Sequence, residues 1–173
     1  SLLKRRRNLL DGVVFSGGEP TAQPALASAI TEVKALGYKI ALHSGGPRPD
    51  HFKAILPDVD WVGFDIKGMP DQYPEITGAD SSSGKKAWQS LQALLTSNTP
   101  YEIRTTVHWH LLTPDSIRKL ARALKNLGVS RYIIQVANTN NMLDPSLAAT
   151  PPPPELDQLW SELKATFSHF EMR

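Results

Sequence analysis

A short polar turn early in the chain combines two glycines with a carboxylate. The segment Ser-Gly-Gly-Glu at positions 16–19 follows residues 13–15, whose apolar β-branched and aromatic side chains predict a buried strand. Paired glycines permit a positive φ and let a ligand approach the bare backbone, while Glu19 adds one negative charge. Because residues 21–36 then follow a helical pattern, the turn is expected at a strand-to-helix junction, where α/β folds bind ligands.

Other polar side chains stand where later strands are predicted to end. The full candidate set is Ser16, Gly17, Gly18, Glu19, Ser44, Asp65, Lys67, Arg104, His108 and Gln135. In a parallel α/β sheet the carboxyl ends of all strands lie at one edge, so these groups are expected to gather there. A single Asp or Arg at a strand end is most often a cap or an ion-pair partner, but a succession of ligand-competent groups favours a site.

Strands and helices alternate in the hydrophobic pattern. Strands are predicted at 13–15, 38–42, 61–66, 101–109, 131–137 and 170–173, and helices at 25–36, 51–56, 86–95, 113–127 and 155–167. Residues 1–10 are expected to end an amphipathic helix with Leu2, Leu3, Leu9 and Leu10 on one side, and residues 68–85 and 138–154 are expected to be loops.

The order of these elements predicts an α/β fold with parallel strands. Nearly every connection is long enough for a right-handed crossover between parallel strands. A full eightfold barrel typically needs about 250 residues, so 173 residues favour a partial (β/α) barrel of about half a dozen strands.

Composition places the chain among ordinary globular proteins and limits its chemistry. A length of 173 residues with 40% hydrophobic and 21% charged residues predicts a single domain over 1–173. The net charge of +2 is too small to argue for nucleic acid, and the basic cluster at 4–7 is interpreted as a solvated helix face. No apolar run is long enough to cross a bilayer and no signal-peptide pattern is present, so no membrane contact and a cytoplasmic location are expected.

The chain contains no cysteine. This excludes disulfides, thiolate catalysis, cysteine-ligated zinc and a cysteine-bound iron-sulfur cluster within these residues. His108 and His110 stand two residues apart in a predicted strand, but a pair alone is weak evidence for a metal site. We therefore assign no metal ligand and no catalytic residue from the sequence.

Three motifs resemble those of the radical S-adenosylmethionine (SAM) superfamily. The segment 16–20 resembles its GGE motif, Asp65-Ile-Lys67 resembles the DxK motif of its glycyl-radical-enzyme activases, and Arg104 resembles the arginine on their fifth strand. Ser44 stands where the third strand of the family presents a small polar residue to SAM. The segments 61–67 and 73–78 are similar to the activases of anaerobic ribonucleotide reductase, and the likeness runs from about residue 2 to the end of the chain.

The resemblance implies SAM as the ligand. The backbone around Gly17 and Gly18, with Glu19, would hold its ammonium, and Arg104 or Lys67 would hold its carboxylate. Ser44 and Asp65 would meet the ribose or orient the ligand, and His108 and Gln135 complete the set assigned to the cofactor. In the family, a reduced iron-sulfur cluster cleaves SAM to a 5′-deoxyadenosyl radical, which takes a hydrogen from a glycine of a partner enzyme. The implied partners are anaerobic ribonucleotide reductase and a reductant such as flavodoxin or ferredoxin.

One departure from the family decides what this chain can do. The three cysteines of the family's CxxxCxxC loop are missing, so SAM-binding residues without redox competence are expected. The chain begins within a helical pattern, which indicates a fragment or a truncated product whose parent holds the first strand and the cluster loop.

Two other readings of the same residues stay open. The chain could be an α/β module that binds a nucleotide or, through residues 68–85, a protein. It could also be a barrel enzyme in which Asp65, Lys67 and His108 perform acid-base or Schiff-base chemistry.

Overall fold

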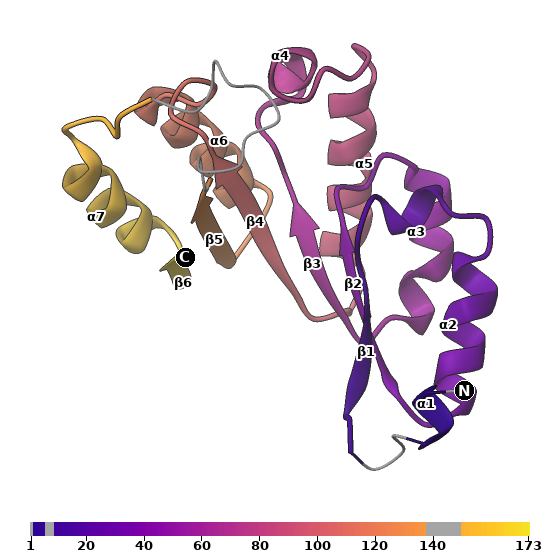
Figure 1. The fold of residues 1–173 in the computed structure, drawn as a ribbon. Coiled ribbons are helices and arrows are strands. Elements are labelled where there is room, and N and C mark those ends of the chain that lie inside the picture. Colours follow the sequence, from indigo (N-terminus) through magenta and orange to yellow (C-terminus); the bar gives the residue numbers. More distant parts are fainter. Residues whose placement is uncertain (1, 6–8, 138–149) are drawn as a thin grey trace. The chain divides into compact units, whose positions relative to one another are not determined.

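The computed structural model describes residues 2–5, 9–137 and 150–173 (Figure 1). The strands are β1 (Gly12–Phe15), β2 (Lys39–Ser44), β3 (Trp61–Asp65), β4 (Tyr101–Val107), β5 (Arg131–Val136) and β6 (His169–Met172). The α-helices are α1 (Leu2–Arg5), α2 (Leu26–Ala35), α3 (Pro49–Ile55), α4 (Tyr73–Thr77), α5 (Ser83–Thr96), α6 (Pro114–Asn126) and α7 (Leu156–Thr166). Short 3-10 helices are η1 (Pro20–Ala22), η2 (Leu56–Asp58) and η3 (Pro70–Gln72). None of the helices in these described ranges is long and apolar enough to span a membrane.

The chain forms two compact units. The first comprises Ser1–Asp65 and Lys86–Glu102, and the second comprises Ile66–Lys85 and Ile103–Arg173. The expected single domain over residues 1–173 stays a prediction.

In the first unit, β1 pairs with β2 and β2 pairs with β3, both in parallel. Parallel neighbours require long crossovers, which α2 and α3 provide, and both helices lie on the same side of the strands in Figure 1. The core is apolar where these layers meet: Ile40, Leu42 and Val62 are fully buried. Phe52 from α3 meets Phe64 from β3 edge to face, with ring centroids 5.5 Å apart.

In the second unit, β4 pairs with β5 and β5 pairs with β6, again in parallel. Thr113 caps the N-terminus of helix α6, since its side chain accepts a hydrogen bond from the backbone N–H of Ser116, and the helix buries Ile117 and Leu120 against the core. The fully buried ring of Tyr132 packs against two aromatic rings near the end of the chain, with centroid distances of 4.9 Å to Phe167 and 6.3 Å to Phe170. An aromatic core therefore connects β5, β6 and the end of α7.

Two sequence predictions about the first unit are wrong. The described part of the first helix ends at Arg5, and Leu9 and Leu10 are outside it with 68% and 49% exposure. Because β1 begins at Gly12, these leucines lead into the strand and do not share a buried helix face. The strand predicted at 13–15 forms as β1, but it is not buried: none of its residues is fully covered and Val14 is 53% exposed.

Two predictions about the second unit are also wrong. Residues 68–85 are not one loop: η3, α4 and the start of α5 lie within them. Their prolines stand in the first turns of short helices, where proline is tolerated, and Gly78 ends α4 with φ at 68°. The predicted strand 101–109 stops at Val107, because the carbonyl of His108 accepts from the N–H groups of both Leu111 and Leu112 and turns the chain. Most of the predicted loop at 138–154 lies outside the described residues.

Candidate functional site

The turn after β1 presents bare backbone. Gly17 and Gly18 have φ angles of 84° and 52°, which L side chains rarely adopt. Apart from each glycine and its chain neighbours, no atom in the part of the chain that the structure describes lies within 4 Å of the position that a Cβ on either glycine would take, so the turn is open on that side. A hollow of about 390 Å³ lies beside Ser16 and Gly17, between the end of β1 and the start of α2. The turn thus offers backbone groups to a molecule from outside.

The side chain of Glu19 points back into the protein. Its Oε1 accepts hydrogen bonds from the backbone N–H of Thr21 (3.0 Å), the hydroxyl of Thr21 (2.6 Å) and the hydroxyl of Ser44 (2.8 Å). Its Oε2 accepts from the backbone N–H of Gly45 at 2.9 Å. Nδ1 of His51, on α3, lies 2.7 Å from the carbonyl oxygen of Thr21 and donates to it. Helix α3, η1 and the ends of β1 and β2 are joined through these bonds.

The turn after β2 is held from a second direction. The buried hydroxyl of Ser44 accepts from the N–H of Gly46 at 2.9 Å, and the carbonyl of Gly46 accepts from the buried hydroxyl of Ser90 at 2.8 Å. A Cβ on Gly46 would lie 2.5 Å from the Cβ of Ser90 and 2.7 Å from Cζ of Phe64, and its φ is 65°. Only glycine fits this position.

Three predicted site residues of the first unit come together around Gly45. A Cβ placed on Gly45 would lie 3.8 Å from Oε2 of Glu19 and 3.7 Å from the backbone oxygen of Asp65. Ser44 precedes Gly45 and bonds Glu19 directly. The carboxyl ends of β1, β2 and β3 therefore gather here, as expected for parallel strands.

In the second unit, Lys67 is brought next to β4. The residue before it, Ile66, donates its N–H to the carbonyl of Arg104 at 2.9 Å and accepts at its own carbonyl from the hydroxyl of Thr105 at 2.8 Å. The N–H of Lys67 donates to the hydroxyl of Tyr73 at 3.1 Å. Lys67 and Arg104 thus belong to adjoining backbone segments.

The hydroxyl of Tyr132 completes this junction. It donates to the hydroxyl oxygen of Thr105 at 3.0 Å. Complete burial raises the pKa of Tyr132 well above its ordinary value, and the bond to Thr105 opposes that rise only in part. The phenol therefore stays protonated and available as a donor.

His108 and Gln135 complete the predicted set. His108 is 6% exposed, its Nδ1 accepts from the N–H of His110 at 3.3 Å, and its buried Nε2 has no hydrogen-bond partner in the described ranges 2–5, 9–137 and 150–173. With Nδ1 as acceptor, Nε2 carries the proton and is a donor. Gln135 is half-buried and lies in register with Thr106 on the neighbouring strand. Arg104 is also buried, at 8% exposure.

The residues present do not fit an iron-sulfur cluster. Such clusters are held mainly by cysteine thiolates, and the sequence has none. Among the residues that the structure describes, no group of three or more His, Asp or Glu side chains could hold a metal ion. The pair His108 and His110 alone supplies fewer side chains than such a group needs.

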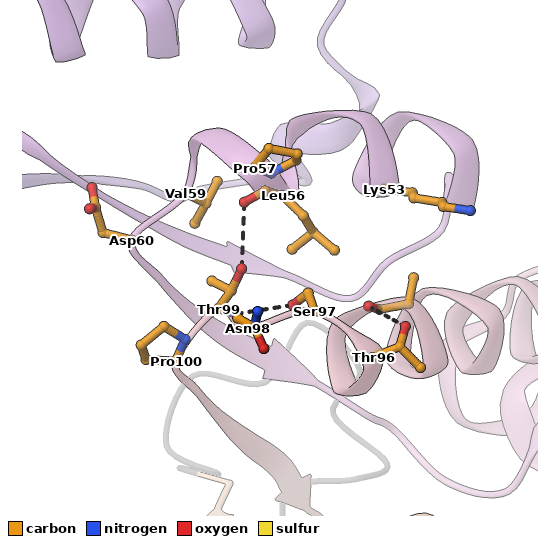
Figure 2. Close-up of a pocket in the computed structure, with 11 residues that line it drawn as sticks. Lys53, Leu56, Pro57, Val59, Asp60, Thr96, Ser97, Asn98, Thr99 and Pro100 are labelled. Carbon is orange, nitrogen blue, oxygen red and sulfur yellow. Dashed lines mark hydrogen bonds between the residues drawn. The ribbon is translucent and has the colours of Figure 1, made fainter.

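A larger hollow, of about 650 Å³, lies at the opposite end of the strands in the first unit (Figure 2). Asp60 and Lys53 line it, and Thr99 reaches across to the carbonyl of Leu56 at 3.5 Å. The carboxylate of Asp60 accepts from the N–H of Ile40 at 2.7 Å, and this bond is the main reason why its pKa lies below the ordinary value. None of the predicted site residues lines this hollow. The carboxylate of Asp60 instead binds the backbone of β2 through Ile40.

Sequence reasoning did not single out four residues that shape the site. They are Thr21, Gly45, Tyr73 and Ser90. The sequence Glu-Pro-Thr is a detectable helix-cap pattern, and the second Gly-Gly pair was visible at 45–46. Nothing local marks Ser90, because its role depends on a contact with Gly46, 44 residues away.

Comparison with known proteins links this geometry to a family. The sequence model of the radical SAM superfamily matches residues 2–108. A protein of Methanocaldococcus jannaschii, named as a candidate glycyl-radical enzyme activating enzyme, is 24% identical over 151 residues, which are 84% of this chain and 62% of the relative. The isethionate sulfite-lyase activating enzyme of Nitratidesulfovibrio vulgaris is 31% identical over 129 residues, 71% of this chain and 41% of the relative. The chain thus spans less than two thirds of the length of both curated relatives.

Solved structures share the fold. A domain of pyruvate-formate lyase-activating enzyme from Bacteroides vulgatus has a TM-score of 0.74 at 18% identity, over 94% of this chain and 98% of that one. SuiB of Streptococcus suis bound to S-adenosylmethionine has a TM-score of 0.65 at 12% identity, over 94% of this chain and 38% of that one. The predicted α/β class of partial barrel with parallel strands is confirmed by the described strands and by these likenesses.

Proposed function

The chain belongs to the radical SAM superfamily, and we propose that its residues form the SAM-holding part of an enzyme that activates a glycyl-radical enzyme. The observation that carries the proposal is the open, left-handed glycine turn after β1, tied through Glu19 to the turn after β2. Backbone groups that are exposed and fixed in place suit a small charged ligand, because little ordering remains to be done on binding.

The charges of SAM match the groups available. Backbone carbonyls of the turn at 16–18 are the acceptors that we propose for its ammonium, and the region of Ser44 and Asp65 is proposed for its ribose. For its carboxylate we propose Lys67 or Arg104, which are the cations of the second unit that the family motifs match. His108 and Gln135 stay in the proposed cofactor set.

The proposal contains no redox step for these residues. In the superfamily, the iron-sulfur cluster supplies the electron that cleaves SAM. Since the chain has no cysteine to hold a cluster, the role that we propose for these residues is to bind and orient SAM and to exclude water around it. A cytoplasmic location stays a prediction.

We further propose a glycyl-radical enzyme as the partner. The names of both curated relatives support an activase, since one is named for glycyl-radical enzymes in general and the other for isethionate sulfite-lyase. The finer proposal, anaerobic ribonucleotide reductase with a flavodoxin or ferredoxin as reductant, rests on the segments 61–67 and 73–78 alone. Binding of the chain to purified anaerobic ribonucleotide reductase, with pyruvate formate-lyase as the competitor, tests it, and a preference for the competitor contradicts it.

Calorimetric titration with SAM tests the core of the proposal. The unmodified chain is expected to bind SAM and not ATP, and Gly17→Val is expected to weaken SAM binding at least tenfold, about 1.4 kcal/mol. The reason is that a β-branched residue cannot hold the φ of 84°. Gly37→Val is the matched control, since Gly37 also has a positive φ (90°) and an open Cβ direction but lies outside the site.

The titration has two contradicting outcomes. Absence of SAM binding by the folded, unmodified chain contradicts the proposal directly. Equal affinity for SAM and ATP favours a general nucleotide-binding module instead.

A further inference from the structure

We propose that Glu19 is a positioning residue: its carboxylate clasps the turns after β1 and β2 to each other and does not itself bind the ammonium of SAM. The part of this inference that concerns SAM rests on the function proposed above. The clasp itself rests only on contacts within the first unit.

Both oxygens of the Glu19 carboxylate already accept hydrogen bonds from the chain. Four donors from the chain bind it: Oε1 accepts from the N–H and hydroxyl of Thr21 and from the hydroxyl of Ser44, and Oε2 accepts from the N–H of Gly45. All four distances lie between 2.6 and 3.0 Å, within the range of good hydrogen bonds. An ammonium from a ligand could bind Oε1 only by displacing one of these donors, so it could add to the carboxylate only at Oε2, beside the N–H of Gly45.

The contacts of Glu19 join segments that are distant in sequence. Ser44 and Gly45 lie 25 and 26 residues after it, on the turn that follows the neighbouring parallel strand. Two of the donors are backbone N–H groups, which cannot turn away as a side chain can. Hydrogen bonds to an ionised acceptor are about twice as strong as neutral ones, so this is a stiff connection.

The clasp continues beyond Glu19. Ser44 donates to Glu19 and accepts from the N–H of Gly46, while the carbonyl of Gly46 is held by Ser90 on α5. Ser44 and Ser90 are buried, at 2% and 0% exposure, so water does not compete for these bonds. The turn at 44–46 is therefore fixed from β1 on one side and from α5 on the other.

A positioning role and a direct ligand-binding role for Glu19 predict that different ligands lose affinity when Glu19 is replaced. If Glu19 fixes both turns, a substitution that removes its hydrogen bonds lowers the affinity for any ligand that contacts either turn. If Glu19 binds the ammonium, the loss is confined to ligands that carry an ammonium. SAM and 5′-methylthioadenosine distinguish the two roles, because the latter keeps the adenosine and the sulfur but lacks the amino-acid part.

Amide hydrogen exchange tests the clasp without a ligand. In Glu19→Gln the amide oxygen can still accept from Thr21 and Ser44, but its NH₂ group faces the N–H of Gly45, which loses its acceptor. We expect exchange at Gly45 to be at least tenfold faster and exchange at Thr21 to be unchanged. In Glu19→Ala both amides are expected to exchange faster. Unchanged exchange at Gly45 in both folded variants overturns the proposal.

The amide of Gly128, in the second unit, is the internal reference for exchange. Glu32→Gln is the control variant, because it removes the same charge from an exposed position on α2. Neither the reference nor the control is expected to change exchange at Gly45.

Calorimetry completes the test. Glu19→Gln is expected to lower the affinity for SAM and the affinity for 5′-methylthioadenosine by the same factor. A loss of affinity for SAM alone overturns the positioning role. If the unmodified chain binds neither ligand, the function proposed above fails, whereas the exchange measurement still decides whether the clasp exists.

Discussion

At the scale of single residues, the glycine turns show which parts of a site can be predicted from the sequence. The pair Gly17 and Gly18 was identified from residue types alone, because only glycine tolerates the positive φ that such a turn needs. The distant partners of Glu19 could not be identified in this way. They depend on the register between β1 and β2, which places Ser44 and Gly45 beside it although they are 25 and 26 residues away.

Gly46 is the residue at which substitution is expected to cost most. In Gly46→Ala the new methyl group would lie 2.5 Å from Ser90 and 2.7 Å from Phe64, in a backbone conformation with φ at 65°. Overpacking costs typically 1–3 kcal/mol and the left-handed conformation about 1–2 kcal/mol more, so we expect a loss of about 3 kcal/mol. Gly128→Ala, where φ is 89° and the Cβ direction is open, should lose only about 1 kcal/mol. Urea denaturation measures both, and equal losses contradict the packing argument.

The lowered pKa of Asp60 makes the stability of the folded chain depend on pH. The N–H of Ile40, and then Lys39, lower the pKa of Asp60, so its ionised form is the one that stabilises the folded chain. This contribution is present above the ordinary pKa of 3.8 and is lost as the pH falls through the lowered value. Since the side chain is 36% exposed, we expect less than about 1 kcal/mol.

Asp60→Asn isolates this effect, because it keeps one acceptor oxygen and removes the charge. The variant is expected to be less stable than the unmodified chain at pH 7, and the difference should shrink towards pH 2. Urea denaturation across this range measures it. A difference that is constant with pH contradicts the assignment to Asp60.

At the scale of elements, the alternation of strands and helices was predicted well, since it follows the hydrophobic period. The errors fall where a local signal has two meanings. Pro70 and Pro74 were interpreted as loop residues, but proline also suits the first turn of a helix, and both lie in the first turns of short helices. The end of β4 was placed two residues late, because Trp109 continues the alternation of the strand while in fact it packs against Trp160, with centroids 6.1 Å apart.

The start of α6 offers a test at this scale. Thr113 accepts a hydrogen bond from the N–H of Ser116 at 3.2 Å, which satisfies one otherwise unpaired donor of the first turn. Thr113→Ala should therefore lower the stability of the chain by about 1 kcal/mol, while Thr113→Ser should keep most of it. Thermal unfolding followed by circular dichroism compares the two, and equal midpoints contradict a capping role.

At the scale of the whole molecule, fold and function were predictable to different depths. A domain of pyruvate-formate lyase-activating enzyme shares the fold at only 18% identity, because many sequences meet the same requirement for parallel strands with apolar cores. The identity of the partner enzyme is a different matter. The motif at 16–20 resembles one that the whole superfamily shares, and the motif at 65–67 resembles one common to the activases, so neither carries information about which glycyl-radical enzyme is recognised.

Because the chain has no cysteine, we expect it neither to assemble an iron-sulfur cluster nor to cleave SAM. Anaerobic incubation with iron and sulfide should leave the purified chain colourless after desalting, because none of its 173 residues can supply a thiolate. Adding a strong reductant should then leave SAM intact, even if the turns after β1 and β2 bind it tightly, because binding SAM and breaking it depend on separate parts of the family's machinery. A ferredoxin stripped of its cluster and treated in parallel verifies the reagents. Brown absorbance that stays with the chain, together with release of 5′-deoxyadenosine, would show that histidine or carboxylate side chains can replace the thiolates, and it would reverse the separation of binding from chemistry proposed for this protein.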